Sequence, residues 1–218
     1  MTIKKSLFIA AFMLLATTMA NAAKKTIYKP WSNGKLKVSA NQRYLIHENG
    51  TPFFWLGNTA WLLPERLNRD EAEYFLAKER ELGYNVEQIQ VLNAIPTFNV
   101  YGQQANNKEF DFSKVSKPGV YGYWEHLDYI IDRAADNGIY IAMDCIWGSM
   151  IGQMDVKKAV AYGKFLGERY KDKPNIIWMI GGDILGDKSP EVWDALARAI
   201  KKYDNRHIMP FHTRGRTT

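Results

Sequence analysis

The feature that most constrains this chain is a short apolar run that ends in two glycines and a carboxylate, Asn175-Ile-Ile-Trp-Met-Ile-Gly-Gly-Asp183. A continuous apolar run of this length, with Pro174 before it, is typical of a strand that is buried on both faces. Such strands occur in parallel sheets covered by helices, and active sites lie at the carboxyl edge of these sheets. Asp183 is therefore a candidate catalytic residue, and its alternative role is to cap the turn that follows.

Strand and helix patterns alternate along the rest of the chain. The predicted strands are residues 53–57, 85–92, 139–147, 175–183 and 207–212, and the predicted helices begin at Asn68, about Tyr123, Asp155 and Ser189. Because each helix returns the chain across the sheet, this alternation makes the strands parallel. It fits an open doubly wound sheet or a (β/α)8 TIM barrel. The long connection over residues 93–120 is either functional or a packed surface loop with its own apolar cluster.

The first predicted strand favours the barrel. It is followed by Leu56-Gly-Asn-Thr59, which is no dinucleotide-binding fingerprint, and GxxxxGK does not occur in the chain. We therefore predict no cofactor. A barrel typically needs about 250 residues, so the strand pattern predicts an α/β TIM barrel that is truncated after about five strands. A β-hairpin over Arg43–Trp55, with Asn49-Gly50 as its two-residue turn, is predicted to precede it.

The first residues predict a secretory signal peptide. Lys4 and Lys5 precede an apolar run over Leu7–Leu15, and Ala20-Asn-Ala22 supplies small residues at the cleavage position. The apolar run is too short to anchor the chain in a bilayer. We therefore expect residues 1–22 to be removed and residues 23–218 to form the partial barrel. The product is expected to be exported to the periplasm or the cell exterior, without membrane association after removal of the signal.

Composition narrows the possible partners. The formal charge of +6 includes Lys4 and Lys5, and without them the chain carries +4 with no dense basic block. Nucleic acid is therefore not an expected partner. Cys145 is the single cysteine, which excludes an intrachain disulfide. The four histidines lack a metal-ligand spacing such as HExxH, so no metal site is expected. Seven Trp and twelve Tyr residues are compatible with a sugar-binding cleft.

Five segments together resemble the apiosidase-like catalytic domain, glycoside hydrolase family 140. They are Phe53–Trp61, Asn85–Leu92, Trp147-Gly148, Ile180–Asp183 and Phe211–Thr218, and they occur in the family order. The resemblance extends from about Lys35 to the end of the chain. It implies a TIM-barrel glycosidase that acts on apiosyl linkages in branched pectin, so the implied partner is a plant cell-wall carbohydrate. Asp183, which matches the Asp of the family's Gly-Gly-Asp, is implied as the general acid/base.

The chain departs from this family in three respects. Asn58 stands where the family usually has Asp, and Thr213 stands where it often has Pro. The nucleophilic Glu of the family lies on a later strand, beyond Thr218. We therefore expect residues 23–218 alone to be inactive. The alternatives are a non-catalytic carbohydrate-binding barrel, an inactive fragment, and an endoglycanase that acts on another plant polysaccharide.

Glycoside hydrolysis needs two carboxylates, one on each side of the scissile bond. We expect Asp183 to be partly desolvated by its apolar neighbours, which would raise its affinity for a proton. Asp144, Glu65 and Glu87 are candidates for the second carboxylate. Asp144 is also interpreted as a structural group bonded inside the barrel, Glu65 as a loop or cap residue, and Glu87 as a residue near the wrong end of its strand.

Other polar and aromatic residues lie at predicted strand ends, where they could contact a sugar. The predicted substrate-binding residues are Asn58, Trp61, Gln90, Trp147, His212 and Arg214. A flat indole ring can stack on a sugar, but core positions are an equally good interpretation for the two tryptophans. The guanidinium of Arg214 could pair with a uronic acid or hold a catalytic carboxylate in place.

Overall fold

The computed structural model describes residues 26–115 and 118–215, so the predicted signal peptide lies outside the described residues. One sheet holds five parallel strands in the order β4-β5-β6-β7-β8, and each strand pairs with the next one along the chain. The strands are Gly57–Thr59 (β4), Val86–Gln90 (β5), Tyr140–Asp144 (β6), Ile176–Ile184 (β7) and Phe211–Thr213 (β8). A doubly wound sheet reverses its strand order at a switch point, whereas a barrel does not. The predicted α/β barrel architecture is confirmed.

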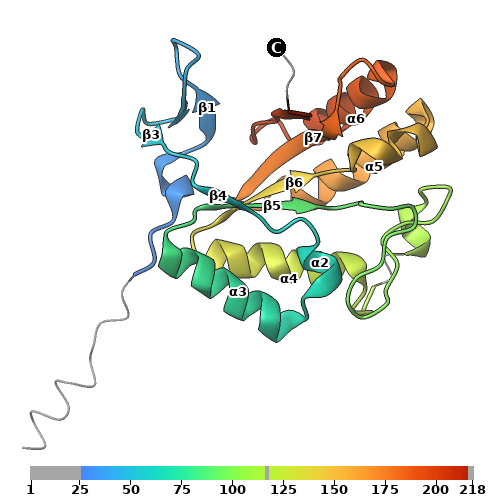
Figure 1. Ribbon diagram of the computed structural model, residues 1–218, viewed down its shortest axis with the longest axis horizontal. Coiled ribbons are helices and arrows are strands. Elements are labelled where there is room, and N and C mark those ends of the chain that lie inside the picture. The colour runs from blue at the N-terminus through green and yellow to red at the C-terminus, as the bar shows by residue number, and fades with distance from the viewer. Residues whose placement is uncertain (1–25, 116–117, 216–218) are drawn as a thin grey trace, which may run out of the picture.

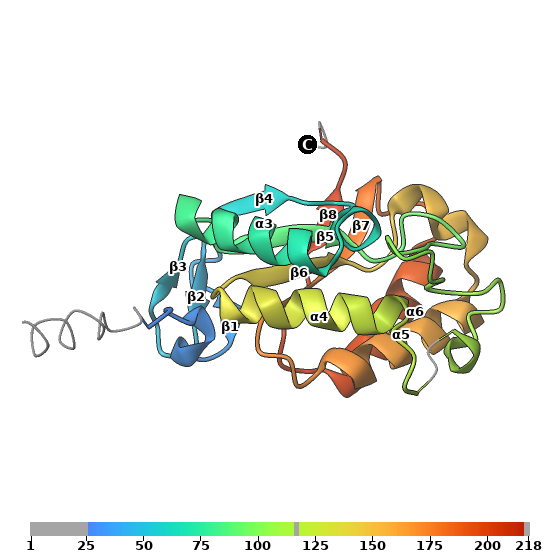
Figure 2. The same cartoon turned by 90° about the horizontal axis from the view of Figure 1, so that it is seen from below.

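Helices cover one face of the curled sheet, with α3 and α4 side by side below it in Figure 1 and α5 and α6 beyond β6 and β7 (Figures 1 and 2). The α-helices are Leu63–Arg66 (α2), Arg69–Leu82 (α3), Tyr123–Asp136 (α4), Val156–Tyr170 (α5) and Pro190–Tyr203 (α6). Three 3₁₀ helices are Pro30–Asn33 (η1), Phe112–Lys114 (η2) and Gly148–Gln153 (η3). The short helix α2 was not predicted.

Local capping chemistry explains two of the helix starts. The side chain of Asn68 accepts a hydrogen bond from the Glu71 N–H at 3.0 Å, and the Glu71 carboxylate accepts from the Asn68 N–H at 2.9 Å. Asp155 caps α5 in the same way, through the N–H of Lys158 at 2.8 Å. Helix α6 begins where it was predicted, with Ser189 at the N-cap position and Pro190 in the first turn, but Ser189 is left-handed (φ 54°) and its side chain makes no capping bond.

A separate three-stranded antiparallel sheet precedes the barrel strands. It consists of Leu36–Val38 (β1), Leu45–His47 (β2) and Pro52–Phe53 (β3), so the predicted hairpin is confirmed as β2 and β3. The strand predicted over residues 53–57 is wrong, because β3 belongs to this small sheet and the barrel strand begins at Gly57. The Asn85 amide causes the break: it donates to the Phe54 carbonyl at 2.8 Å and accepts from the Leu56 N–H at 2.9 Å.

The core lies on both faces of the parallel sheet. On the helix-covered face, Ile89, Met143 and Trp178 are fully buried against the helices. On the concave face, Val86 and Met179 pack with residues of the small sheet. Side chains alternate along a strand, so the face of β5 that carries Val86 also carries Gln88 and Gln90. On the neighbouring strand β6, Asp144 is in register with Gln90 and lies on the same face. The concave face therefore carries the polar side chains of Gln88, Gln90 and Asp144.

The long connection over residues 93–120 packs against the helices in its second half. Phe112 stacks on Phe165 with ring centroids 4.2 Å apart, and the Trp124 indole donates to the Ala105 carbonyl at 2.8 Å. Phe98 and Tyr101 in the first half are exposed. The prediction of a packed loop with its own apolar cluster is therefore confirmed for its second half.

Helices α5 and α6 pack closely at Gly163, and this contact allows the effect of a Gly→Ala substitution on stability to be predicted. A Cβ atom on Gly163 would lie 2.6 Å from the Ala199 Cβ and 2.7 Å from the Leu196 carbonyl oxygen. Overpacking of this kind costs about 1–3 kcal/mol, and the better helix propensity of Ala returns up to about 1 kcal/mol. We expect Gly163→Ala to lower the free energy of unfolding, measured by urea titration. Gly152→Ala is the control, because nothing lies within 4 Å of that position; equal stability of the two variants would contradict the prediction.

Candidate active site

Two glycines place Asp183 at the end of β7. Gly181 and Gly182 have φ angles of 122° and 103°, a region that side chains other than hydrogen rarely allow. A Cβ on Gly181 would lie 2.2 Å from the His212 carbonyl oxygen, and one on Gly182 would lie 2.6 Å from the Gly148 nitrogen. Asp183 itself has a φ of 52°, and backbone strain of this kind is found at functional sites. The glycines thus let two neighbouring backbones approach and turn Asp183 out of the sheet.

The Asp183 side chain is 65% exposed, so the prediction that it is partly desolvated is wrong. The reason is that Trp178 points to the helix-covered face, where it is fully buried, and does not cover the carboxylate. The Asp183 N–H donates to His212 Nδ1 at 3.3 Å, and the carboxylate Oδ1 lies 4.0 Å from the same nitrogen. Because Nδ1 accepts this hydrogen bond, Nε2 is the ring nitrogen that carries the proton.

Three rings form an aromatic cluster next to Asp183, here defined as Trp61, Trp147 and His212. Their centroids are 5.5 Å apart for Trp61 and Trp147, 5.5 Å for Trp61 and His212, and 5.9 Å for Trp147 and His212. They follow or belong to three different strands, β4, β6 and β8, so the fold brings them together from distant parts of the sequence. Both indoles are half-buried, which leaves part of each ring open to a ligand.

The other predicted substrate-binding residues are placed differently. Gln90 is buried on the concave face, and its N–H donates to the Trp61 carbonyl at 2.8 Å. Arg214 is exposed just after β8, and its N–H donates to the Ile184 carbonyl at 3.4 Å. Asn58 is not part of this group, because its amide donates to the Glu79 carboxylate of α3 at 3.1 Å.

Asp144 lies at the carboxyl end of β6 and is fully buried. Apart from the Ile146 backbone, neither of its carboxylate oxygens has a hydrogen-bond partner among the residues that the structure describes. Burial raises the pKa of Asp144 well above its usual range, and the negative charge of Asp183 adds to this increase. The nearby Ile146 backbone makes a smaller opposing contribution to that pKa.

The remaining candidate carboxylates belong to other environments. Glu65 lies in α2, where its Oε2 accepts from the Asn93 amide at 3.1 Å and partial burial raises its pKa. Glu87 is fully buried, and its pKa is raised to about 8 by burial and by the neighbouring charge of Glu79 on α3. Glu87 therefore faces the helices and not the concave face.

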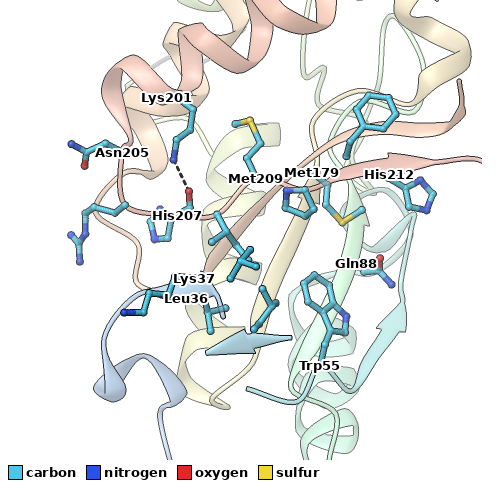
Figure 3. Close-up of a pocket in the computed structure, with 16 residues that line it drawn as sticks. Leu36, Lys37, Trp55, Gln88, Met179, Lys201, Asn205, His207, Met209 and His212 are labelled. Carbon is cyan, nitrogen blue, oxygen red and sulfur yellow. Dashed lines mark hydrogen bonds between the residues drawn. The ribbon is translucent and has the colours of Figure 1, made fainter. Parts of the chain in front are cut away.

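A groove of about 720 Å³ runs along the concave face from the small sheet to β8 (Figure 3). Its lining is largely apolar, with Trp55, Met179 and Ile208, and it includes Gln88 and His212. Asp183 and the two tryptophans of the aromatic cluster do not line the groove, but His212 belongs to both, so the groove adjoins the carboxylate site. Gln88 was not predicted, although its position two residues before Gln90 places it on the same face of the strand.

Metal and membrane features were also considered for residues 26–115 and 118–215. In this part of the chain, no group of three or more His, Cys, Asp or Glu side chains has a geometry that could hold a metal ion. No helix among the same residues has both the length and the apolar character needed to span a bilayer.

A family model, the apiosidase-like catalytic domain, matches residues 39–218 of this chain. A glycoside hydrolase family 5 protein from Bacteroides vulgatus ATCC 8482 is 60% identical with a TM-score of 0.85, over 88% of this chain and 42% of that one. A structure described as a glycoside hydrolase is 61% identical with the same TM-score, over 88% of this chain and 43% of that one. Endoglucanase Cel5A of Thermobifida fusca shares the fold alone, with 15% identity, a TM-score of 0.59, and coverage of 86% and 57%. The chain thus spans less than half of the first two structures, and none of the curated proteins matches it.

Proposed function

Because this chain belongs to the apiosidase-like catalytic domain family, we propose that it is a glycosidase that cleaves apiosyl linkages of branched pectin. The observation that carries this proposal is the exposed Asp183 carboxyl group, which the glycine pair holds beside the aromatic cluster. A sugar that stacks on Trp61 or Trp147 would bring a glycosidic oxygen to the carboxyl edge of the sheet, where active sites of barrels lie.

In this proposal Asp183 acts as the general acid and gives its proton to the glycosidic oxygen as the bond to the anomeric carbon breaks. The same residue then takes a proton from water in a retaining enzyme, or stays an anion until solvent reprotonates it in an inverting enzyme. His212 holds the Asp183 backbone through Nδ1. The opposing carboxylate is proposed to come from a later strand of the longer form that the relatives have.

The proposal is tested with apiose-containing pectic oligosaccharides and a form of the protein extended through those further strands. Release of apiosyl sugars, measured by anion-exchange chromatography, is the expected result. Turnover of other plant polysaccharides without action on the apiosyl linkages would favour an endoglycanase instead. Binding of the oligosaccharide without any turnover would favour a carbohydrate-binding barrel.

The aromatic cluster leads to a separate prediction about the affinity for an oligosaccharide. We expect Trp147→Ala to weaken oligosaccharide binding by about ten-fold, which corresponds to about 1.4 kcal/mol, because the ring face that stacks on the sugar is lost. Calorimetric titration measures this change. Tyr74→Ala is the matched control, since Tyr74 is a 67% exposed aromatic residue on the outer helix α3. Equal affinities of the two variants would exclude Trp147 as a contact.

We also propose that the protein is exported and that the mature chain begins at Ala23. This proposal rests on Lys4-Lys5, the apolar run that follows and Ala20-Asn-Ala22. Intact-mass analysis of exported protein is expected to give a chain that lacks residues 1–22. A mass that includes these residues would show that the cleavage site is wrong.

A further inference from the structure

Three tyrosine rings and a guanidinium meet on the outer surface, near the first turns of α3 and α4, which lie side by side (Figure 1). The rings of Tyr101 and Tyr121 are T-shaped with centroids 5.6 Å apart, and the two residues are 43% and 38% exposed. The exposed Arg69 lies 5.6 Å from the ring centroid of Tyr121 and 4.2 Å from that of Tyr129. These four residues are here called the tyrosine patch, and the proposed reaction uses none of them.

Hydrogen bonds hold the two exposed rings in place. The Tyr101 hydroxyl accepts from the Arg69 N–H, the first of α3, at 3.0 Å. The buried His126 places Nε2 at 2.9 Å from the Leu67 carbonyl, which can only accept, so Nε2 carries a proton. Burial lowers the pKa of His126, so its other nitrogen, Nδ1, accepts from the Tyr121 hydroxyl at 2.8 Å. Aromatic faces that are fixed in this way lose little conformational entropy when a ligand stacks on them.

The positive charge of the patch is not neutralised by a carboxylate. None of the ion pairs within residues 26–115 and 118–215 includes Arg69. Two carboxylates of the same helix have other partners, since Glu71 accepts from the Asn68 N–H at 2.9 Å and Glu73 accepts from the Tyr129 hydroxyl at 2.8 Å. An exposed guanidinium that is held over aromatic rings without a carboxylate partner favours an anionic ligand.

We propose that the tyrosine patch is a second carbohydrate-binding site, which takes an acidic sugar. The sugar ring stacks on Tyr101 or Tyr121, and its carboxylate pairs with Arg69. The guanidinium is what distinguishes a uronic acid from a neutral sugar. The patch is separate from the carboxylate site, because its residues follow β4 and β5, whereas Asp183 belongs to β7 near the other edge of the sheet. The inference goes beyond the proposed function and rests on it only for the choice of a pectic ligand.

The site is tested by calorimetric titration of the full-length protein with an unbranched oligomer of galacturonic acid, which lacks apiosyl linkages. We expect the parent protein to bind this oligomer, and Arg69→Gln and Tyr101→Ala to bind it about ten-fold more weakly, because each removes one strong contact. Lys78→Gln is the matched control, since Lys78 lies 5.7 Å from the Tyr74 ring centroid but is paired with Glu81. Absence of binding, an unchanged affinity of Arg69→Gln, or an equal loss in Lys78→Gln would overturn the proposal.

The role of charge is tested with salt and with the carboxylate next to Arg69. Sodium chloride should weaken binding by the parent protein more than binding by Arg69→Gln, because salt screens an exposed ion pair. Asp70→Asn removes an exposed negative charge beside the guanidinium, so this variant should bind at least as tightly as the parent. The same salt dependence in Arg69→Gln, or weaker binding by Asp70→Asn, would contradict the proposed ion pair.

Two further comparisons identify the ligand and its place. A neutral galactose oligomer or a poly-glutamate peptide should bind more weakly than the galacturonic acid oligomer, and equal binding of either would overturn the recognition of an acidic sugar. A loss of binding in Trp147→Ala without a loss in Arg69→Gln would place the oligomer at the aromatic cluster and overturn the second site. The oligomer has no apiosyl linkage, so failure of this inference and failure of the proposed function are measured separately.

Discussion

Replacement of Asp183 by Asn is expected to lower kcat on an apiose-containing pectic oligosaccharide by about 10²–10⁴-fold, the usual loss for a general acid. Asn has nearly the same shape but cannot give a proton to the departing sugar oxygen. The fold should be preserved, since the side chain is 65% exposed and the contact with His212 is made by the backbone N–H. Steady-state kinetics of the extended form, with circular dichroism as a check of folding, measure the effect.

Asp187→Asn is the matched control for this experiment. Asp187 is an exposed aspartate in the loop after β7, four residues beyond Asp183. Its replacement removes the same charge from the same edge of the sheet, so it measures any general electrostatic effect on substrate binding. Equal activity of the Asp183→Asn and parent proteins would remove Asp183 from the mechanism.

Replacement of Glu87 by Gln is expected to stabilise the protein at neutral and alkaline pH. The folded state raises the pKa of Glu87 from 4.5 to about 8 through burial and the nearby Glu79. Between these values the folded protein holds a proton that the unfolded chain has released, so stability is lost as pH rises from about 4.5 through about 8. Gln cannot ionise, and it has nearly the same shape as Glu. The gain should reach a few kcal/mol near pH 8.

Urea unfolding at pH 5 and at pH 8 measures this prediction. The stability difference between Glu87→Gln and the parent protein should grow from the lower to the higher pH. Glu81→Gln on helix α3, which also carries Glu79, is the control, because Glu81 is 61% exposed and pairs with Lys78 at the surface. A constant difference between parent and Glu87→Gln at the two pH values would mean that Glu87 is ionised in the folded protein.

Most of the fold could be predicted because its signals are local. The apolar run of β7 and the capping residues of α3 lie within a few positions of the elements that they define. The first barrel strand was misplaced because the Asn85 amide, some 30 residues away, separates Phe54 from Leu56. Strand β8 was predicted too early, over residues 207–212. Residues 208 and 210 do accept hydrogen bonds from β7, but the Asp204 carboxylate holds Arg206 and His207 in a turn.

A residue of the site could be placed from the sequence only where a local sequence motif determines its position. Asp183 follows two glycines at a strand end, and this motif fixes both its place and its backbone conformation. Which way a side chain points depends on strand register, which the sequence does not display. Asn58 was therefore expected at the substrate side, although it pairs with Glu87 in register and reaches α3. The uncompensated burial of Asp144 likewise depends on contacts with β5 and β7.

The backbone contacts at Gly181 and Gly182 have a consequence for protein engineering. Two neighbouring backbones, at His212 and Gly148, determine where the chain turns toward Asp183. Saturation libraries at positions 181 and 182 should therefore return only glycine. The exposed residues 185–188 take no part in these contacts. Loops of other lengths could be grafted there to change which sugars the site accepts while the carboxylate stays in place.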